Sequence, residues 1–315
     1  MDRIPILIKI ARMYHEQGIR QADIAERLRI SQSRVSRSLK EATRLGLVRT
    51  VVVPPPGFHP ELEEGVRDRF GLADVVVAQS SFVDEREMLP ALGSAAAAYL
   101  ETVIQAGDRI GISSWSSSLI ATVNAMGPLH STKAEQVVQL IGGVGDPTAQ
   151  MQATRLAERL AMRTGATPML LSAPGIVASS SVRDAFLADP YIEATTGAWS
   201  DLSLVLVGIG SLQPSPLLQQ SGNAIPEPVL EELRAHEAVG DICLRFFDED
   251  GTIVDAGIDS RVLGISVDQL LAVPRRVGVA GGARKYDAIR AALRGGWLDV
   301  LVTDALTAER LIADR

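Results

Sequence analysis

The sequence has little of what builds disulfides and metal sites. Of its 315 residues one is cysteine, Cys243, and the four histidines stand far apart, at positions 15, 59, 130 and 236. A single cysteine excludes an internal disulfide, and neither residue type shows the spacing typical of metal ligands. We therefore predict no metal site, and we expect Cys243, which lies in an apolar run, to be buried without a function.

Long apolar runs and nucleotide motifs are missing too. No run approaches the roughly 18 apolar residues that a membrane span needs, and the N-terminus shows no signal-peptide pattern. No glycine-rich segment matches a Walker or dinucleotide-binding fingerprint, which argues against nucleotide hydrolysis. These absences predict a soluble cytoplasmic protein with no membrane partner and no cofactor.

The charge is acidic overall but unevenly distributed. The formal net charge is −7, yet residues 1–50 hold 11 Lys+Arg against 5 Asp+Glu, a net charge of +6, which leaves −13 for the remainder. Phosphate groups repel an acidic body and attract a basic segment. The asymmetry predicts a small DNA-binding head on a larger body that does not touch DNA.

Residues 21–39 have the pattern of two short helices joined by a tight turn. Ile24 and Leu28 recur on one face of a first helix. Ser31 is a suitable N-cap for a second helix, whose first inward position is Val35. This is the layout of a helix-turn-helix, in which the second helix enters the major groove of DNA.

The outward face of the second helix is basic and polar, with no acidic residue before Glu41. Gln and Arg side chains pair with base edges, whereas Ser, Arg and Lys hold phosphates. A charged helix face is usually only a solvated surface, but the short turn and the basic face together favour DNA binding. The predicted DNA-binding residues are Gln21, Ser31, Gln32, Ser33, Arg34, Ser36, Arg37 and Lys40.

Two further elements are expected around this motif. A helical stripe precedes it, and the β-prone run 47–53 would form the strand of a small wing. Prolines at 54, 55, 56 and 60 then interrupt helix and strand hydrogen bonding. The predicted domains are a head, 1–53, a stiff linker, 54–60, and a body, 61–315. The stripe consists of Ile4, Leu7, Ile8, Ala11 and Tyr14.

Beyond residue 60, short apolar runs alternate with helical segments. The run at 202–209 is largely apolar on both faces, as buried parallel strands are. This alternation predicts an α/β domain with a doubly wound, mainly parallel sheet. The expected strands are 73–78, 108–112, 136–141, 169–171, 202–209, 241–246, 276–280 and 299–303, with helices at 151–163, 228–236, 286–294 and 305–312.

Glycine and serine residues gather where the expected strands end and helices begin. Anions bind at such places because backbone N–H groups and the helix dipole favour negative charge. Glycines there often serve backbone geometry alone, and Lys285 could be an ordinary surface lysine, but a serine-rich helix start with a lysine at another helix start suits a phosphate. The candidate effector-binding residues are Ser116, Ser117, Ser118, Gly142, Gly143, Gly208, Gly210, Asp241, Gly282 and Lys285.

Head and body together resemble the SorC/DeoR-type sugar-responsive transcriptional regulators of bacteria, over essentially the whole chain. The most specific stretch is 279–304, with Val-Ala-Gly-Gly-Ala-Arg-Lys at its start and Leu-Val-Thr-Asp at its end. The resemblance implies an effector domain related to sugar-phosphate isomerases, a phosphorylated sugar or polyol as effector, and homodimers or homotetramers on operator DNA. It places the phosphate near residues 116–118 and Lys285, and the sugar near Gly208, Gly210 and Asp241. The other matching stretches are 21–39, 111–119, 138–143, 208–211 and 240–251.

One departure from the family bears on ligand chemistry. Some members hold an aldehyde sugar covalently through a lysine after the strand that corresponds to 137–141, whereas Val144, Gly145 and Asp146 follow here and supply none. We therefore expect reversible binding. Two alternatives to a regulator remain. A sugar-phosphate isomerase with a DNA-binding head would need a base and an acid, and Asp241 alone is a weak candidate. A constitutive DNA-binding protein would not need so many convergent glycine turns.

Overall fold

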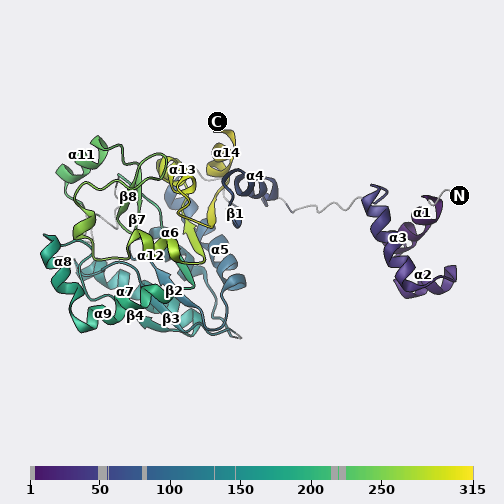
Figure 1. Ribbon diagram of the computed structural model, residues 1–315, viewed down its shortest axis with the longest axis horizontal. Coiled ribbons are helices and arrows are strands. Elements are labelled where there is room, and N and C mark those ends of the chain that lie inside the picture. Colours follow the sequence, from purple (N-terminus) through teal and green to yellow (C-terminus); the bar gives the residue numbers. More distant parts are fainter. Residues whose placement is uncertain are drawn as a thin grey trace. The chain divides into compact units, whose positions relative to one another are not determined.

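The structure is a computed structural model that describes residues 4–48, 57–79, 84–130, 132–145, 147–213 and 225–314, with Pro55 and Gln219 (Figure 1). Side chains are not described at 147–149 and 152. Contacts between Cα atoms divide the chain into two units, residues 1–55 and 56–315. Within the described part of the chain, no helix is long and apolar enough to cross a membrane.

The first unit contains the helices α1 (Ile4–His15), α2 (Gln21–Leu28) and α3 (Gln32–Arg44). Its core joins Leu7 and Ile10 of α1 to Ile24, Val35 and Leu39 of the other two helices. The buried residues of α1 are Leu7, Ile10, Ala11 and Met13. The predicted stripe is wrong at three of its five positions, since these lie at the surface: Ile4, Ile8 and Tyr14.

Part of the predicted wing and linker lies outside the described residues. Residues 49–54 and 56 are outside the described residues, and so is Asp146, farther along the chain. Leu47 and Val48 form a bend rather than a strand. Pro60 is the first residue of a helix, α4 (Pro60–Phe70). A proline suits this position because the first amide of a helix has no acceptor within it. The helix therefore begins inside the predicted linker.

The second unit is built on a seven-stranded sheet in the order β1-β10-β9-β5-β2-β3-β4, and all of its pairings are parallel. Alternate residues of a strand enter separate cores: Val205 and Val207 face one, and Leu204 and Leu206 face the other. Burial on both faces is typical of parallel sheets, which confirms the predicted α/β class. The strands are β1 (Asp74–Ala78), β2 (Arg109–Ile112), β3 (Gln136–Gln139), β4 (Thr167–Met169), β5 (Leu204–Val207), β9 (Arg276–Val279) and β10 (Val300–Asp304).

Helices cover this sheet, and α4 lies against α14 and β1 (Figure 1). Arg69 of α4 donates a hydrogen bond to the Ile312 carbonyl of α14, at 3.1 Å. The further helices are α5 (Glu85–Val103), α6 (Ser117–Ala125), α7 (Pro147–Thr164), α8 (Ser180–Leu187), α9 (Pro190–Gly197), α11 (Glu227–Ala235), α12 (Val267–Ala272), α13 (Tyr286–Arg294) and α14 (Ala305–Ala313).

A second, antiparallel sheet contains β6 (Gly210–Ser211), β7 (Gly240–Ile242) and β8 (Arg245–Phe247). The sequence predicted one strand at 241–246, and this is wrong. Cys243 and Leu244 have φ values of 55° and 61° and reverse the chain between β7 and β8. Positive φ at both central residues is the conformation of the tight hairpin turn that matches strand twist. Glycine or asparagine usually marks such a turn, so a Cys-Leu pair gave no signal.

The chain changes direction across the sheet between β5 and β2. From β2 it proceeds through α6 to β3 on one side, whereas β5 neighbours β9 on the other. In open α/β sheets, ligands bind in the crevice beyond the carboxyl ends of strands at such a point. The carboxyl ends of β9, β5 and β2 are thus the first place to look for a site.

Candidate functional site

The first candidate site is the exposed face of α3. Ser31 is the N-cap of this helix, and its hydroxyl accepts a hydrogen bond from the Arg34 amide at 3.3 Å. Arg29 ends α2 in the left-handed conformation, with φ 52°, and the Ile30 amide donates to the Ala25 carbonyl. Three residues, 29–31, therefore separate the two helices, as the helix-turn-helix motif requires.

Seven of the eight predicted DNA-binding residues lie on α3 or at its N-cap, whereas Gln21 is the first residue of α2. Val35 and Leu39 are buried, which turns the intervening positions outward. Arg37 extends along the helix, and its Nε donates to the Ser33 carbonyl at 3.4 Å. Gln21 and Ser36 are half-buried. The exposed residues are Ser31, Gln32, Ser33, Arg34, Arg37 and Lys40.

The second candidate site is a pocket beyond the carboxyl ends of β2, β5 and β9. It brings together predicted residues from four separate stretches of sequence, and the segments after β2 and β5 meet the turn before α13 and the hairpin β7–β8. Of the predicted effector residues, its lining includes Ser116, Ser117, Ser118, Gly208, Gly210, Asp241 and Lys285.

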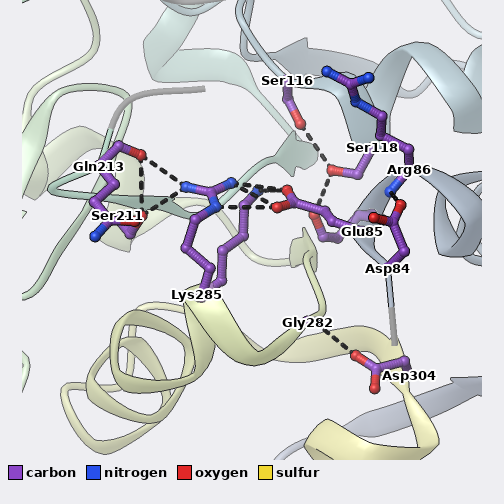
Figure 2. A network of polar contacts seen from close by, with 12 residues as sticks. Asp84, Glu85, Arg86, Ser116, Ser118, Ser211, Gln213, Gly282, Lys285 and Asp304 are labelled. Carbon is purple, nitrogen blue, oxygen red and sulfur yellow. Dashed lines mark hydrogen bonds and ion pairs between the residues drawn. The ribbon is translucent and has the colours of Figure 1, made fainter. Parts of the chain in front are cut away.

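Residues 116–118, all serine, form the start of α6, and Figure 2 shows Ser116 and Ser118 there. Ser116 is the N-cap, and its hydroxyl accepts from the Leu119 amide at 3.3 Å. The Ser118 hydroxyl donates to the Val279 carbonyl at 2.7 Å, so the 2.8 Å contact between the two hydroxyls requires Ser116 to be the donor. Both hydroxyl protons are therefore engaged, whereas the amides of Ser117 and Ser118, the first two residues of α6, have no acceptor within the helix.

Lys285 ends the 3-10 turn (Ala283–Lys285) that precedes α13. Its side chain is 13% exposed, and its Nζ lies 3.9 Å from Oε1 of Glu85 (Figure 2). Burial lowers the pKa of Lys285, and the negative charge of Glu85 opposes that change. This lysine is therefore not a solvated surface residue, which was the alternative that the sequence left open.

Asp241 contributes a buried carboxyl group to the same pocket. Its Oδ2 accepts a hydrogen bond from the Leu244 amide at 3.0 Å, across the hairpin turn. Burial raises the pKa of Asp241 to about 6, although the Leu244 amide and the charge of Lys285 both act to lower it. The pocket therefore holds a hydrogen-bonding acid and a cation, a pair that suits a ligand with hydroxyl groups and an anionic group.

Gly208 and Gly210 allow these side chains to enter the pocket. A Cβ on Gly208 would lie 2.5 Å from the Ser116 hydroxyl, and a Cβ on Gly210 would overlap Oδ1 of Asp241 at 1.9 Å. Any larger residue at these positions would displace Ser116 or Asp241. The two glycines are thus required by close approach, and they shape the site without supplying a side chain.

The other three predicted glycines, Gly142, Gly143 and Gly282, are not among the residues that line the pocket. A Cβ on Gly142 would lie 2.2 Å from the Pro174 carbonyl oxygen, and one on Gly143 2.6 Å from Nε2 of Gln139. The Gly282 amide donates to Oδ2 of Asp304 at 2.8 Å (Figure 2). Each glycine therefore has a local packing or turn geometry that accounts for it.

The pocket also contains residues that the sequence did not single out. Cys243, which the sequence predicted to be buried without a function, is buried and lines the pocket. Burial raises the pKa of its thiol to about 12, which keeps the thiol protonated. Trp115 has a buried indole N–H without an acceptor in the part of the chain that the structure describes. Arg284 precedes Lys285 in the sequence, so the same strand-end argument could have identified it as a pocket residue. Glu85 begins a helix about 200 residues earlier, and the sequence gives no signal that places it in the pocket. Further lining residues are Ser113, Ser114, Ser211 and Gln213.

Comparisons with known proteins match both units of the chain. Residues 55–313 match the family described as "Putative sugar-binding domain", and residues 10–57 match the MarR family. The chain is 30% identical to the sorbitol operon regulator of Klebsiella pneumoniae, over 99% of this chain and 98% of that protein. It is also 30% identical to the deoxyribonucleoside regulator of Bacillus subtilis, over 99% of each chain.

Solved structures show the same relationship. The crystal structure of the full-length sorbitol operon regulator of Klebsiella pneumoniae superimposes with a TM-score of 0.74 and covers 99% of both chains, at 30% identity. These relatives are transcriptional regulators and not enzymes, so the comparisons favour a regulator over the isomerase-like alternative.

Proposed function

Because the chain belongs to the SorC/DeoR-type family of bacterial sugar-responsive transcriptional regulators, we propose that its pocket binds a phosphorylated sugar or polyol reversibly and thereby controls operator binding. The observation that carries the proposal is the largely buried Lys285 side chain in a pocket that also contains the start of α6. A helix N-terminus and an ammonium group both favour a phosphate. The operator lies in the cytoplasm, and we place the protein there.

The sugar part of the ligand, away from the phosphate, would contact Asp241 and Trp115, neither of which carries a positive charge. Asp241 accepts hydrogen bonds from sugar hydroxyls, and the unpartnered Trp115 indole N–H is a donor for a ligand oxygen. The lysine that would hold an aldehyde covalently is missing after β3, where Val144 and Gly145 follow. Lys285 itself is reserved for the phosphate, so binding is non-covalent.

The experiment is calorimetry with a panel of pentose, hexose and hexitol phosphates, each beside its unphosphorylated form. Lys285→Ala should weaken binding of the phosphorylated ligand by at least about tenfold, since one charge-assisted hydrogen bond contributes about 1.5–3 kcal/mol. Binding of the unphosphorylated form should change little. Lys133→Ala, which removes an exposed lysine, is the control for loss of one positive charge. Equal affinities of wild type and Lys285→Ala for the phosphorylated ligand would contradict the proposal.

On DNA, we propose that Gln32 and Arg34 contact base edges, with Arg37 and Lys40 on phosphates. Support comes from their common exposure on α3 and from the positive charge of residues 1–50. A single head makes few contacts, so we also propose a homodimer or homotetramer that presents several heads to repeated half-sites. We propose limits of 1–53 for the head, 54–60 for the linker and 61–315 for the effector domain, with Pro60 as the residue at which the linker enters α4.

A further inference from the structure

Glu85, the first residue of α5, lines the pocket, and its carboxylate contacts two cationic side chains there, Arg284 and Lys285. Its carboxylate accepts three hydrogen bonds from Arg284: Nε to Oε2 at 3.0 Å, and Nη2 to Oε1 and Oε2 at 2.8 and 2.9 Å. The same Oε1 lies 3.9 Å from the Lys285 ammonium. Figure 2 shows the Glu85 side chain pointing from α5 toward Lys285.

Arg284 is fully engaged by this arrangement. Its remaining nitrogen, Nη1, donates to the Ser211 hydroxyl at 2.8 Å and to the Gln213 carbonyl at 2.7 Å. The guanidinium therefore joins the start of α5 to β6 and the residues after it. Among the described residues, the ion pair of Lys285 is with Glu85, and at 3.9 Å it is longer than a hydrogen bond.

A carboxylate and a phosphate compete for the same cations. Guanidinium and ammonium groups bind either anion with similar geometry. Two anions facing the same cations inside a partly buried pocket repel each other strongly, since screening by water is weak there. A ligand phosphate that reaches Lys285 must therefore displace Glu85 or bind against its charge.

We propose that Glu85 is a built-in competitor of the ligand phosphate, which binds by exchange with this carboxylate and thereby selects a doubly charged group. The inference rests on the proposed function, in which Lys285 holds the phosphate. A sugar acid carries one negative charge, as Glu85 does, so its exchange for Glu85 adds no attraction to the two cations. A phosphate dianion supplies one charge more than Glu85, so it outcompetes the carboxylate where a sugar acid does not.

The test is calorimetry with inorganic phosphate and with gluconate at constant ionic strength, on the full chain. The variants are Glu85→Gln, which keeps the shape and removes the charge, and Glu87→Gln, which changes an exposed acid in the same turn of α5. Glu85→Gln should bind phosphate about tenfold more tightly than wild type and should gain affinity for gluconate. Glu87→Gln should match wild type for both anions. Glu85→Ala gives the same comparison if Glu85→Gln does not fold.

Unchanged or weaker phosphate binding by Glu85→Gln overturns the role of Glu85. Lys285→Ala in the same series separates this result from failure of the proposed function. If phosphate binds wild type and is lost in Lys285→Ala while Glu85→Gln matches wild type, the proposed function stands and the exchange is wrong. If phosphate binds wild type and Lys285→Ala equally, or binds neither wild type nor Glu85→Gln, both are wrong.

Discussion

At the scale of one residue, the buried carboxyl of Asp241 makes the stability of the fold depend on pH. Its carboxyl is buried against Gly210, and its charged form has lost most of its hydration. Burial therefore raises its pKa from 3.8 to about 6. A folded-state pKa above the unfolded value means that the fold holds this proton more tightly than the unfolded chain does. Its stabilising contribution is complete below about pH 4 and is lost as the pH rises through about 6.

The variant Asp241→Asn should remove this pH dependence. The Leu244 amide can still donate to the amide oxygen of asparagine, so the turn keeps its hydrogen bond. Between about pH 4 and pH 7, the free energy of unfolding of wild type should fall relative to Asp241→Asn by about 2–3 kcal/mol, as a rise of about two pKa units implies. Denaturant titrations at several pH values measure this.

Glu231→Gln, an exposed change on α11, is the control for loss of one negative charge, and its difference from wild type should stay flat over the same pH range. A flat difference for Asp241→Asn as well would mean that Asp241 is solvated and does not titrate near 6.

At the scale of elements, sequence reasoning succeeded where one pattern decides the outcome. The start of α3 followed from Ser31, and the helix predicted at 286–294 has the bounds of α13. Sequence reasoning failed where tertiary packing decides. The strand predicted at 241–246 became a hairpin because Cys243 and Leu244 adopt positive φ, and nothing in their side chains announces that conformation.

The site was predictable to a similar extent. Residues directly after strands β2 and β5 could be placed because the carboxyl ends of parallel strands share one edge of the sheet. Glu85 could not be placed, because its role depends on where α5 begins relative to the turn at 283–285. Gly142 and Gly143 were chosen by the same strand-end rule, yet the backbone of Pro174 and the side chain of Gln139 occupy the space around them.

The exposed face of α3 gives a prediction for DNA recognition. Arg34→Ala should cost about 1–3 kcal/mol of binding free energy at the cognate operator and relax the preference at one base pair, because bidentate contacts discriminate between bases. Lys40→Ala should instead weaken all sequences alike and reduce the salt dependence, since it removes a phosphate contact. Fluorescence anisotropy with an operator selected from random DNA measures both. Unchanged base preference in Arg34→Ala would mean that another residue reads the operator.

At the scale of the whole molecule, charge and assembly belong together. Residues 1–50 carry a net +6 and the remainder −13, so DNA attracts the heads and repels the bodies. The proposed assembly would hold several heads over repeated half-sites.

Light scattering on the full-length protein should report a dimer or a tetramer, with or without ligand. A strict monomer in the presence of both DNA and ligand would contradict the proposed assembly.

The central claim is that a phosphorylated sugar in the pocket controls the affinity for DNA. The most direct test measures operator affinity by anisotropy while the sugar phosphate found by calorimetry is titrated. Wild type should change its operator affinity by at least about fivefold, the lower end of typical allosteric coupling, and the unphosphorylated sugar should have little effect. Lys285→Ala should need a much higher ligand concentration for the same change. An operator affinity that stays constant while the pocket fills with ligand would contradict the account.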